Sequence, residues 1–186
     1  ANAPLRAAVK SAVQGGLPTV AECGGFLYLG QSLEGTDGQN WPMAGVLPGE
    51  GIRVGRLVRF GYATLTAKAD SMLFRAGETL PVHEFHHWDS TENGDAFTAA
   101  KANGRQWACG FANARLYAGF PHLYWAGTPL PKRFAAAAEH YIKETSSKQA
   151  KHLRTLCTAN PSQALQLANC TITTMQKDLS TCSVFR

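Results

Sequence analysis

A cysteine in the stretch TVAECGGFLYLG, residues 19–30, stands where an apolar, β-branched run meets two glycines. Cys23 directly follows a predicted strand, and Gly24 and Gly25 open a Leu/Tyr-rich segment with the character of a helix. A nucleophile on a tight strand-to-helix turn needs small neighbours, because backbone and side chains crowd one another there. The pattern predicts a reactive thiol at Cys23; the alternative is a buried, inert cysteine beside a glycine-rich turn.

The helix that is predicted to follow Cys23 affects the chemistry of the thiol. Its free N–H groups and the positive end of its dipole would point at the sulfur. That geometry favours the thiolate and can also stabilise an oxyanion.

A thiol nucleophile also needs a base, which is usually a histidine. The chain has six histidines. His122, in the aromatic stretch GFPHLYW, stands at a predicted strand end or loop, which is a natural place for a catalytic base. His140 lies in a predicted amphipathic helix, and His152 lies in the C-terminal stretch, where no sequence pattern indicates a function. Both therefore suit the role of catalytic base less well. The alternative for His122 is a structural histidine.

The stretch VHEFHHWDS, residues 82–90, raises the question of a metal site. It is one residue short of HExxH, and its flanks look extended rather than helical. In a strand, Glu84 and His86 share one face and His83 lies on the other, so three ligands would need a bulge. We therefore predict no metal here. The stretch instead indicates a substrate-side strand that uses His83, Glu84 and His86, or structural hydrogen bonding.

Helices and strands must position these groups. The spacing of apolar residues predicts a helix that is capped by Asn2 and ends at Gly15 and Gly16, a short buried strand PTVAE, and a helix from Gly24 that ends near Gly35. The order helix–strand–turn–helix implies a parallel α/β layer. We expect an α/β fold with a mainly parallel sheet, helices on both faces, and the cysteine at the carboxyl end of a strand.

Further along the chain the composition changes twice. Residues 51–125 contain β-branched and aromatic runs broken by Gly, Asn and Asp, which predict strands and turns, and a helix is expected from Pro131 to residue 144. The stretch after it is rich in Ser, Thr, Gln and Asn and has cysteines without CxxC spacing, so a zinc site is weakly supported. We expect one domain over residues 1–143 and an extension of unknown role over residues 144–186.

Composition and charge narrow the class of protein. The chain has 186 residues, 45% hydrophobic and 17% charged, which is typical of a single soluble domain. No apolar run reaches the roughly 18 residues of a membrane span, and five irregularly spaced cysteines favour the reducing cytoplasm. Residues 1–144 carry 13 basic and 12 acidic side chains, so most of the net charge of +5 belongs to the tail. We therefore expect neither nucleic acid nor membrane as a partner.

The chain opens directly on a helix, without an initiator methionine and without a strand to flank PTVAE. We therefore expect the domain to be N-terminally truncated.

Three ordered segments carry a resemblance to a known family, and they are residues 18–30, 60–90 and 110–125. They resemble the nucleophile segment, the Gly-Tyr strand with its His-Glu-Phe-His segment, and the closing histidine segment of class I (triad) glutamine amidotransferase domains. The particular resemblance is to the C-terminal domain of cobyrinic acid a,c-diamide synthases. It covers roughly residues 5–143, and three ordered motifs are more specific than any one of them.

The resemblance implies a flavodoxin-like class I amidotransferase fold and assigns roles to residues. Cys23 is the implied nucleophile, His122 the base, and the N–H of Gly24 one oxyanion donor. The implied reaction is glutamine hydrolysis through a glutamyl thioester, with release of ammonia. Many triad amidotransferases have a carboxylate two residues after the histidine; here that position is Tyr124, so another group must orient His122.

The resemblance also implies partners outside this chain. ATP, with Mg²⁺, would bind a separate N-terminal synthetase domain and activate a carboxylate of a corrinoid or related tetrapyrrole for amidation, and this chain itself would hold no cofactor. We expect the 186 residues alone to hydrolyse glutamine weakly or not at all. The alternatives are an inactive fragment, a non-enzymatic docking domain of the same fold, or another Cys–His hydrolase.

Overall fold

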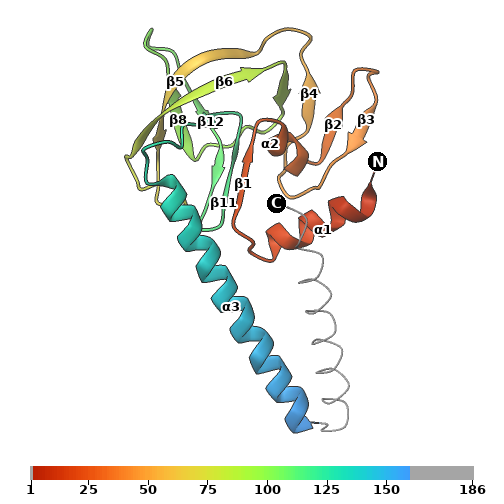
Figure 1. The fold of residues 1–186 in the computed structure, drawn as a ribbon. Coiled ribbons are helices and arrows are strands. Elements are labelled where there is room, and N and C mark those ends of the chain that lie inside the picture. The colour runs from red at the N-terminus through yellow and green to blue at the C-terminus, as the bar shows by residue number, and fades with distance from the viewer. Residues whose placement is uncertain (1, 160–186) are drawn as a thin grey trace, which may run out of the picture. The chain divides into compact units, whose positions relative to one another are not determined.

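The computed structural model describes residues 2–159, with side chains for residues 2–151. The chain divides into two compact units, Ala1–Tyr141 and Ile142–Arg186. Three helices occur in the described residues (Figure 1), and they are α1 (Ala3–Gln14), α2 (Gly24–Leu29) and α3 (Leu130–Ala159), of which α3 continues from the first unit into the second. None of these helices is long and apolar enough to cross a bilayer.

Helix α1 begins and ends at the residues that the sequence indicates. The Asn2 side chain accepts a hydrogen bond from the Leu5 N–H at 3.1 Å, and Pro4 occupies the first turn, where no intrahelical donor is needed. Gly15 closes the helix, and Gly16 adopts a φ of +90° that glycine takes without strain. The predicted start and stop are confirmed.

The strand that precedes the cysteine belongs to a small sheet of three strands. Their order is β1 (Thr19–Glu22), β11 (Leu116–Gly119) and β10 (Phe111–Ala112). β1 and β11 are parallel, with Glu22 opposite Gly119, and the Cys23 N–H extends the ladder by donating to the Gly119 carbonyl at 2.8 Å. This pairing holds the end of β1 against the segment that leads to His122.

Two further sheets contain the remaining strands. The larger has five strands, in the order β12 (His122–Leu123), β6 (Thr79–His86), β5 (Arg59–Ala67), β8 (Phe97–Ala100) and β9 (Gln106–Cys109). The other has four strands, in the order β3 (Asn40–Pro42), β2 (Ser32–Glu34), β4 (Gly51–Arg53) and β7 (Trp88–Ser90). Every neighbouring pair in the larger sheet is antiparallel.

The molecule is a mixed α/β protein, but the prediction of a mainly parallel sheet is wrong for the described residues. Among the named strands, only β1–β11 and β2–β4 pair in parallel. A parallel neighbour requires a crossover of a dozen or more residues, usually through a helix. Residues 51–125 contain no helix, so successive strands such as β5 and β6 turn back as antiparallel neighbours.

Two predicted helix ends are also wrong. α2 ends at Leu29 rather than near Gly35, because Gly30 turns extended (φ −67°, ψ −174°) and the chain continues into β2. A Cβ at Gly30 would lie 2.6 Å from the Gly49 carbonyl oxygen, so this turn passes too close to its neighbour for a side chain. α3 begins at Leu130 and runs to Ala159, beyond the predicted end at residue 144. The rest of the predicted extension, residues 160–186, lies outside the described residues.

Two hydrophobic cores meet at β11. The first is packed around the larger sheet, and its most buried large members are Leu65, Leu73, Phe74, Phe97, Tyr117 and Leu130. The second surrounds α2 and β1, and it includes Ala21, Phe26, Leu29, Leu47, Leu116 and Ala118. Successive β11 side chains point to opposite faces, so Tyr117 belongs to the first core while Leu116 and Ala118 belong to the second.

The packing of Phe97 predicts a large loss of stability on truncation. Phe97 is 1% exposed and contacts the rings of Phe74 and Tyr117 edge-on, at centroid distances of 5.1 and 5.6 Å. We expect Phe97→Ala to lower the free energy of unfolding by about 3–5 kcal/mol, measured by urea denaturation. Phe85→Ala, at a ring that is 51% exposed, is the matched control and should cost less than about 1 kcal/mol. Equal losses for the two variants would contradict this account of the core.

Candidate active site

Cys23 occupies a strained turn between β1 and α2. It is the N-cap of α2, with φ 49° and ψ −106°, and it is the one non-glycine residue of the described chain with a positive φ. Such a conformation costs of order 1–3 kcal/mol and is often found at functional sites. The strand-to-helix turn expected from the sequence is present, and its strain lies on the cysteine itself.

The two glycines after the cysteine have a different role from the one expected. A Cβ at Gly24 would meet no heavy atom within 4 Å, and one at Gly25 would meet only the Ala21 Cβ at 3.7 Å. Crowding within the described chain therefore does not require either glycine. Their absent side chains leave the space around the start of α2 open.

Burial raises the pKa of the Cys23 thiol, which is half-buried. The neighbouring backbone N–H of Gly24 lowers the pKa, but the carboxylates of Glu84 and Glu22 raise it further. The N–H at the start of α2 favours the thiolate, as expected, but desolvation and the two negative charges outweigh it, so the pKa is raised overall. A thiol that stays protonated near neutral pH needs a base when it attacks.

The structure brings His122 to the same end of the β1–β11 pair as Cys23. The His122 side chain is 45% exposed, and its Nδ1 lies 3.4 Å from Oε2 of Glu22, the residue that directly precedes Cys23. The other oxygen of that carboxylate, Oε1, accepts hydrogen bonds from the Leu123 N–H at 3.2 Å and the Trp125 indole N–H at 3.4 Å. One carboxylate thus connects the turn at the cysteine with the histidine strand.

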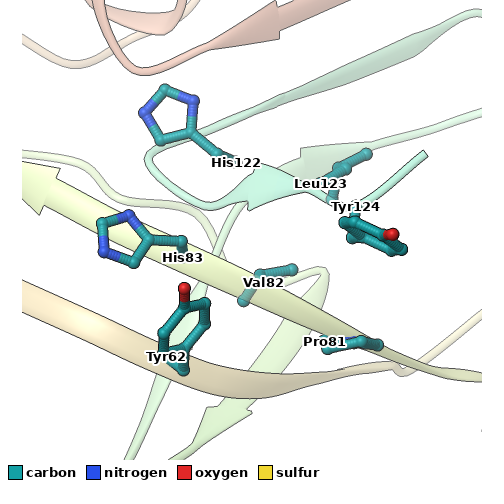
Figure 2. A pocket seen from close by; sticks show the side chains of 7 residues that line it. All are labelled: Tyr62, Pro81, Val82, His83, His122, Leu123 and Tyr124. Carbon is teal, nitrogen blue, oxygen red and sulfur yellow. The ribbon is translucent and has the colours of Figure 1, made fainter. Parts of the chain in front are cut away.

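An apolar pocket of about 460 Å³ lies on the outer side of β12, β6 and β5. Figure 2 shows its lining residues, which are Tyr62, Pro81, Val82, His83, His122, Leu123 and Tyr124. His83 is the cross-strand partner of His122, and its ring contacts the Tyr62 ring at a centroid distance of 5.2 Å. Cys23 is not among the lining residues. Of the three predicted substrate-side residues, His83 is therefore the one that lies beside His122 at a cavity.

Glu84 and His86 lie on the opposite, buried face of β6, as the alternation of the strand indicates. They are 2% and 4% exposed, and His86 Nε2 lies 3.2 Å from Glu84 Oε2. His86 Nδ1 contacts the Trp88 carbonyl at 2.6 Å, and its ring stacks on Phe120 at 3.8 Å. This packing favours structural hydrogen bonding for the pair, and a substrate-side role for either residue stays a prediction.

Within the described residues, no group of three or more His, Cys, Asp or Glu side chains is placed to hold a metal ion. Among residues 2–151, whose side chains are described, the other cysteine is Cys109, which is 3% exposed, and burial raises the pKa of its thiol to about 12. It belongs to the core of the larger sheet.

Sequence reasoning missed Glu22. The absence of a carboxylate at Tyr124 indicates that another group orients His122, but the spatial link between residues 22 and 122 is a property of the β1–β11 pairing. The one usable signal is the carboxylate next to the cysteine in AECGG.

Comparison with known proteins identifies the class to which this fold and site belong. Residues 1–129 match the family of CobB/CobQ-like glutamine amidotransferase domains, and the chain belongs to that family.

Relatives of this chain include proteins named cobyrinate a,c-diamide synthase. The protein of that name from Caldanaerobacter subterraneus subsp. tengcongensis is 32% identical over 125 residues, which cover 66% of this chain and 28% of the relative. The Salmonella typhimurium protein is 32% identical over 148 residues (76% and 32%), and the Streptococcus sanguinis protein is 35% identical over 130 residues (67% and 28%). The chain thus spans less than a third of the length of these relatives.

The raised pKa of Cys23 predicts how its reactivity depends on pH. Because the thiolate is the reactive form, we expect alkylation of Cys23 by iodoacetamide to speed up about tenfold per pH unit from pH 6 to pH 9, without a plateau. Peptide mass spectrometry follows Cys23 separately from the other cysteines, and buried Cys109 serves as the slow internal reference. A rate that levels off below pH 8 would contradict the direction of the pKa shift.

The backbone strain predicts an unusual order of stabilities at position 23. Cys23→Gly removes the steric penalty of the positive φ, whereas Cys23→Ala keeps it. We expect the glycine variant to be more stable than the alanine variant by about 1 kcal/mol in urea unfolding, after allowance for the greater freedom of glycine in the unfolded chain. An alanine variant that is the more stable of the two would show that the turn is not strained.

Proposed function

We propose that this chain is the glutamine-hydrolysing part of an ATP-dependent cobyrinate, or related tetrapyrrole, a,c-diamide synthase. One observation carries the proposal, namely a strained cysteine whose preceding carboxylate contacts a histidine a hundred positions later. Membership of the glutamine amidotransferase family and the names of the relatives support it.

In the proposed reaction, the sulfur of Cys23 attacks the side-chain amide carbon of glutamine while His122 takes the thiol proton. The raised pKa of the thiol is the reason that proton transfer must accompany the attack. The N–H of Gly24 stabilises the tetrahedral oxyanion. When the intermediate collapses, the C–N bond breaks, the amide nitrogen takes the proton from His122, and ammonia leaves a glutamyl thioester.

Water completes the cycle. His122 takes a proton from the water that attacks the thioester carbon, the C–S bond breaks, and the sulfur leaves and regains a proton as glutamate is released. We assign ATP and Mg²⁺ to a synthetase domain in the part of the relatives that this chain does not match. There the ammonia would convert an activated carboxylate of a corrinoid or related tetrapyrrole into an amide.

A covalent probe tests the proposed site directly. The 186-residue chain is treated with an electrophilic glutamine analogue, and the adduct is located by peptide mass spectrometry. We expect the adduct on Cys23, protection by excess L-glutamine but not D-glutamine, and loss of the adduct in Cys23→Ala. His122→Asn, which removes the base, should slow labelling by about 10²–10⁴-fold.

Cys109→Ser is the matched control, because this thiol lies in the core and should not contribute to labelling. An adduct elsewhere in the wild-type chain would overturn the assignment of Cys23. A folded chain without any adduct would favour an inactive fragment or a non-enzymatic module, and labelling of Cys23 without protection by glutamine would favour another Cys–His hydrolase.

A further inference from the structure

The Glu22 carboxylate is held between two segments that are far apart in the sequence. It stands at the end of β1, directly before the strained turn, and its partners all come from the segment that begins at β12. Its side chain is 23% exposed, so water competes only in part for the carboxylate oxygens.

The two oxygens of this carboxylate contact different groups. Oε1 accepts from the backbone N–H of Leu123 and from the indole N–H of Trp125, whose ring in turn packs edge-on against Phe134 at 6.4 Å. Oε2 faces Nδ1 of His122 at 3.4 Å. Because Oε1 is tied to the strand that carries the histidine, Oε2 has a defined position relative to the imidazole ring.

We propose that Glu22 is the positioning residue of His122: it accepts the Nδ1 proton and thereby leaves Nε2 as the nitrogen that exchanges a proton with the Cys23 thiol. The inference rests on the proposed function and adds to it the group that orients the base. Which ring nitrogen carries the proton follows from the hydrogen bond that the other makes, so a carboxylate at Nδ1 selects the tautomer with a free Nε2. Tyr124, two residues after the histidine, has no carboxylate to do this.

The same residue also influences the thiol. The negative charge of Glu22 raises the pKa of Cys23, while its Oε2 lies 3.4 Å from Nδ1 of His122. Glu22 therefore lies within electrostatic reach of both partners of the proposed proton transfer.

The test combines a tautomer measurement with a rate. In the full chain labelled with ¹⁵N-histidine, we expect His122 of the wild type to show a protonated Nδ1 and a free Nε2 when the ring is neutral. In Glu22→Gln the amide NH₂ competes for Nδ1, so the two tautomers should mix. The rate of Cys23 labelling by the electrophilic glutamine analogue should fall by about tenfold or more. Glu139→Gln, an exposed change on α3, is the matched control and should alter neither quantity.

A second variant keeps the inference open to refutation if Glu22→Gln does not fold. Trp125→Phe keeps an aromatic ring but removes the indole N–H that holds Oε1, and we expect a smaller shift of the tautomer in the same direction. An unchanged tautomer and labelling rate in a folded variant would overturn the positioning role, while Cys23 labelling in the wild type would still support the proposed function. Conversely, a wild-type chain without a Cys23 adduct would defeat the proposed function, and the tautomer measurement would still decide whether Glu22 orients His122.

Discussion

The site depends on the parallel pairing of β1 with β11. The hydrogen bond from the Cys23 N–H to the Gly119 carbonyl, at 2.8 Å, is the last of that ladder, and the chain reaches His122 three residues after Gly119. A slip of one residue in a strand moves its side chains to the other face of the sheet. The register therefore decides whether the Glu22 carboxylate meets the histidine or points away from it.

The electrostatics of the site favour a resting thiol rather than a resting thiolate. Desolvation and the carboxylates of Glu22 and Glu84 outweigh the N–H of Gly24. Oxidation of cysteine proceeds through the thiolate, so a protonated Cys23 resists it. Near neutral pH, Cys23 therefore does not rest as a reactive anion.

Local patterns in the sequence predicted local structure well. The caps of α1, the turn at Cys23 and the opposite faces of His83 and Glu84 all follow from residues close together in the chain. The mainly parallel sheet was a wrong extrapolation from one helix–strand–helix unit to a region without helices. The early end of α2 depends on the close approach of Gly49, and the contact of Glu22 with His122 depends on the pairing with β11. Both involve residues far apart in the chain, so no short stretch of sequence predicts them.

The position of β11 between two cores has a consequence for how the molecule comes apart. All four of its residues are buried, and Leu116, Tyr117 and Ala118 alternate between the packing around α2 and the packing around the larger sheet. If either core unfolded, the face of β11 that packs against it would become exposed to water. Apolar side chains of the remaining core would then also be exposed. The first unit should therefore lose its structure in a single cooperative step, and the amides of β11 should be among the last to exchange with solvent hydrogen.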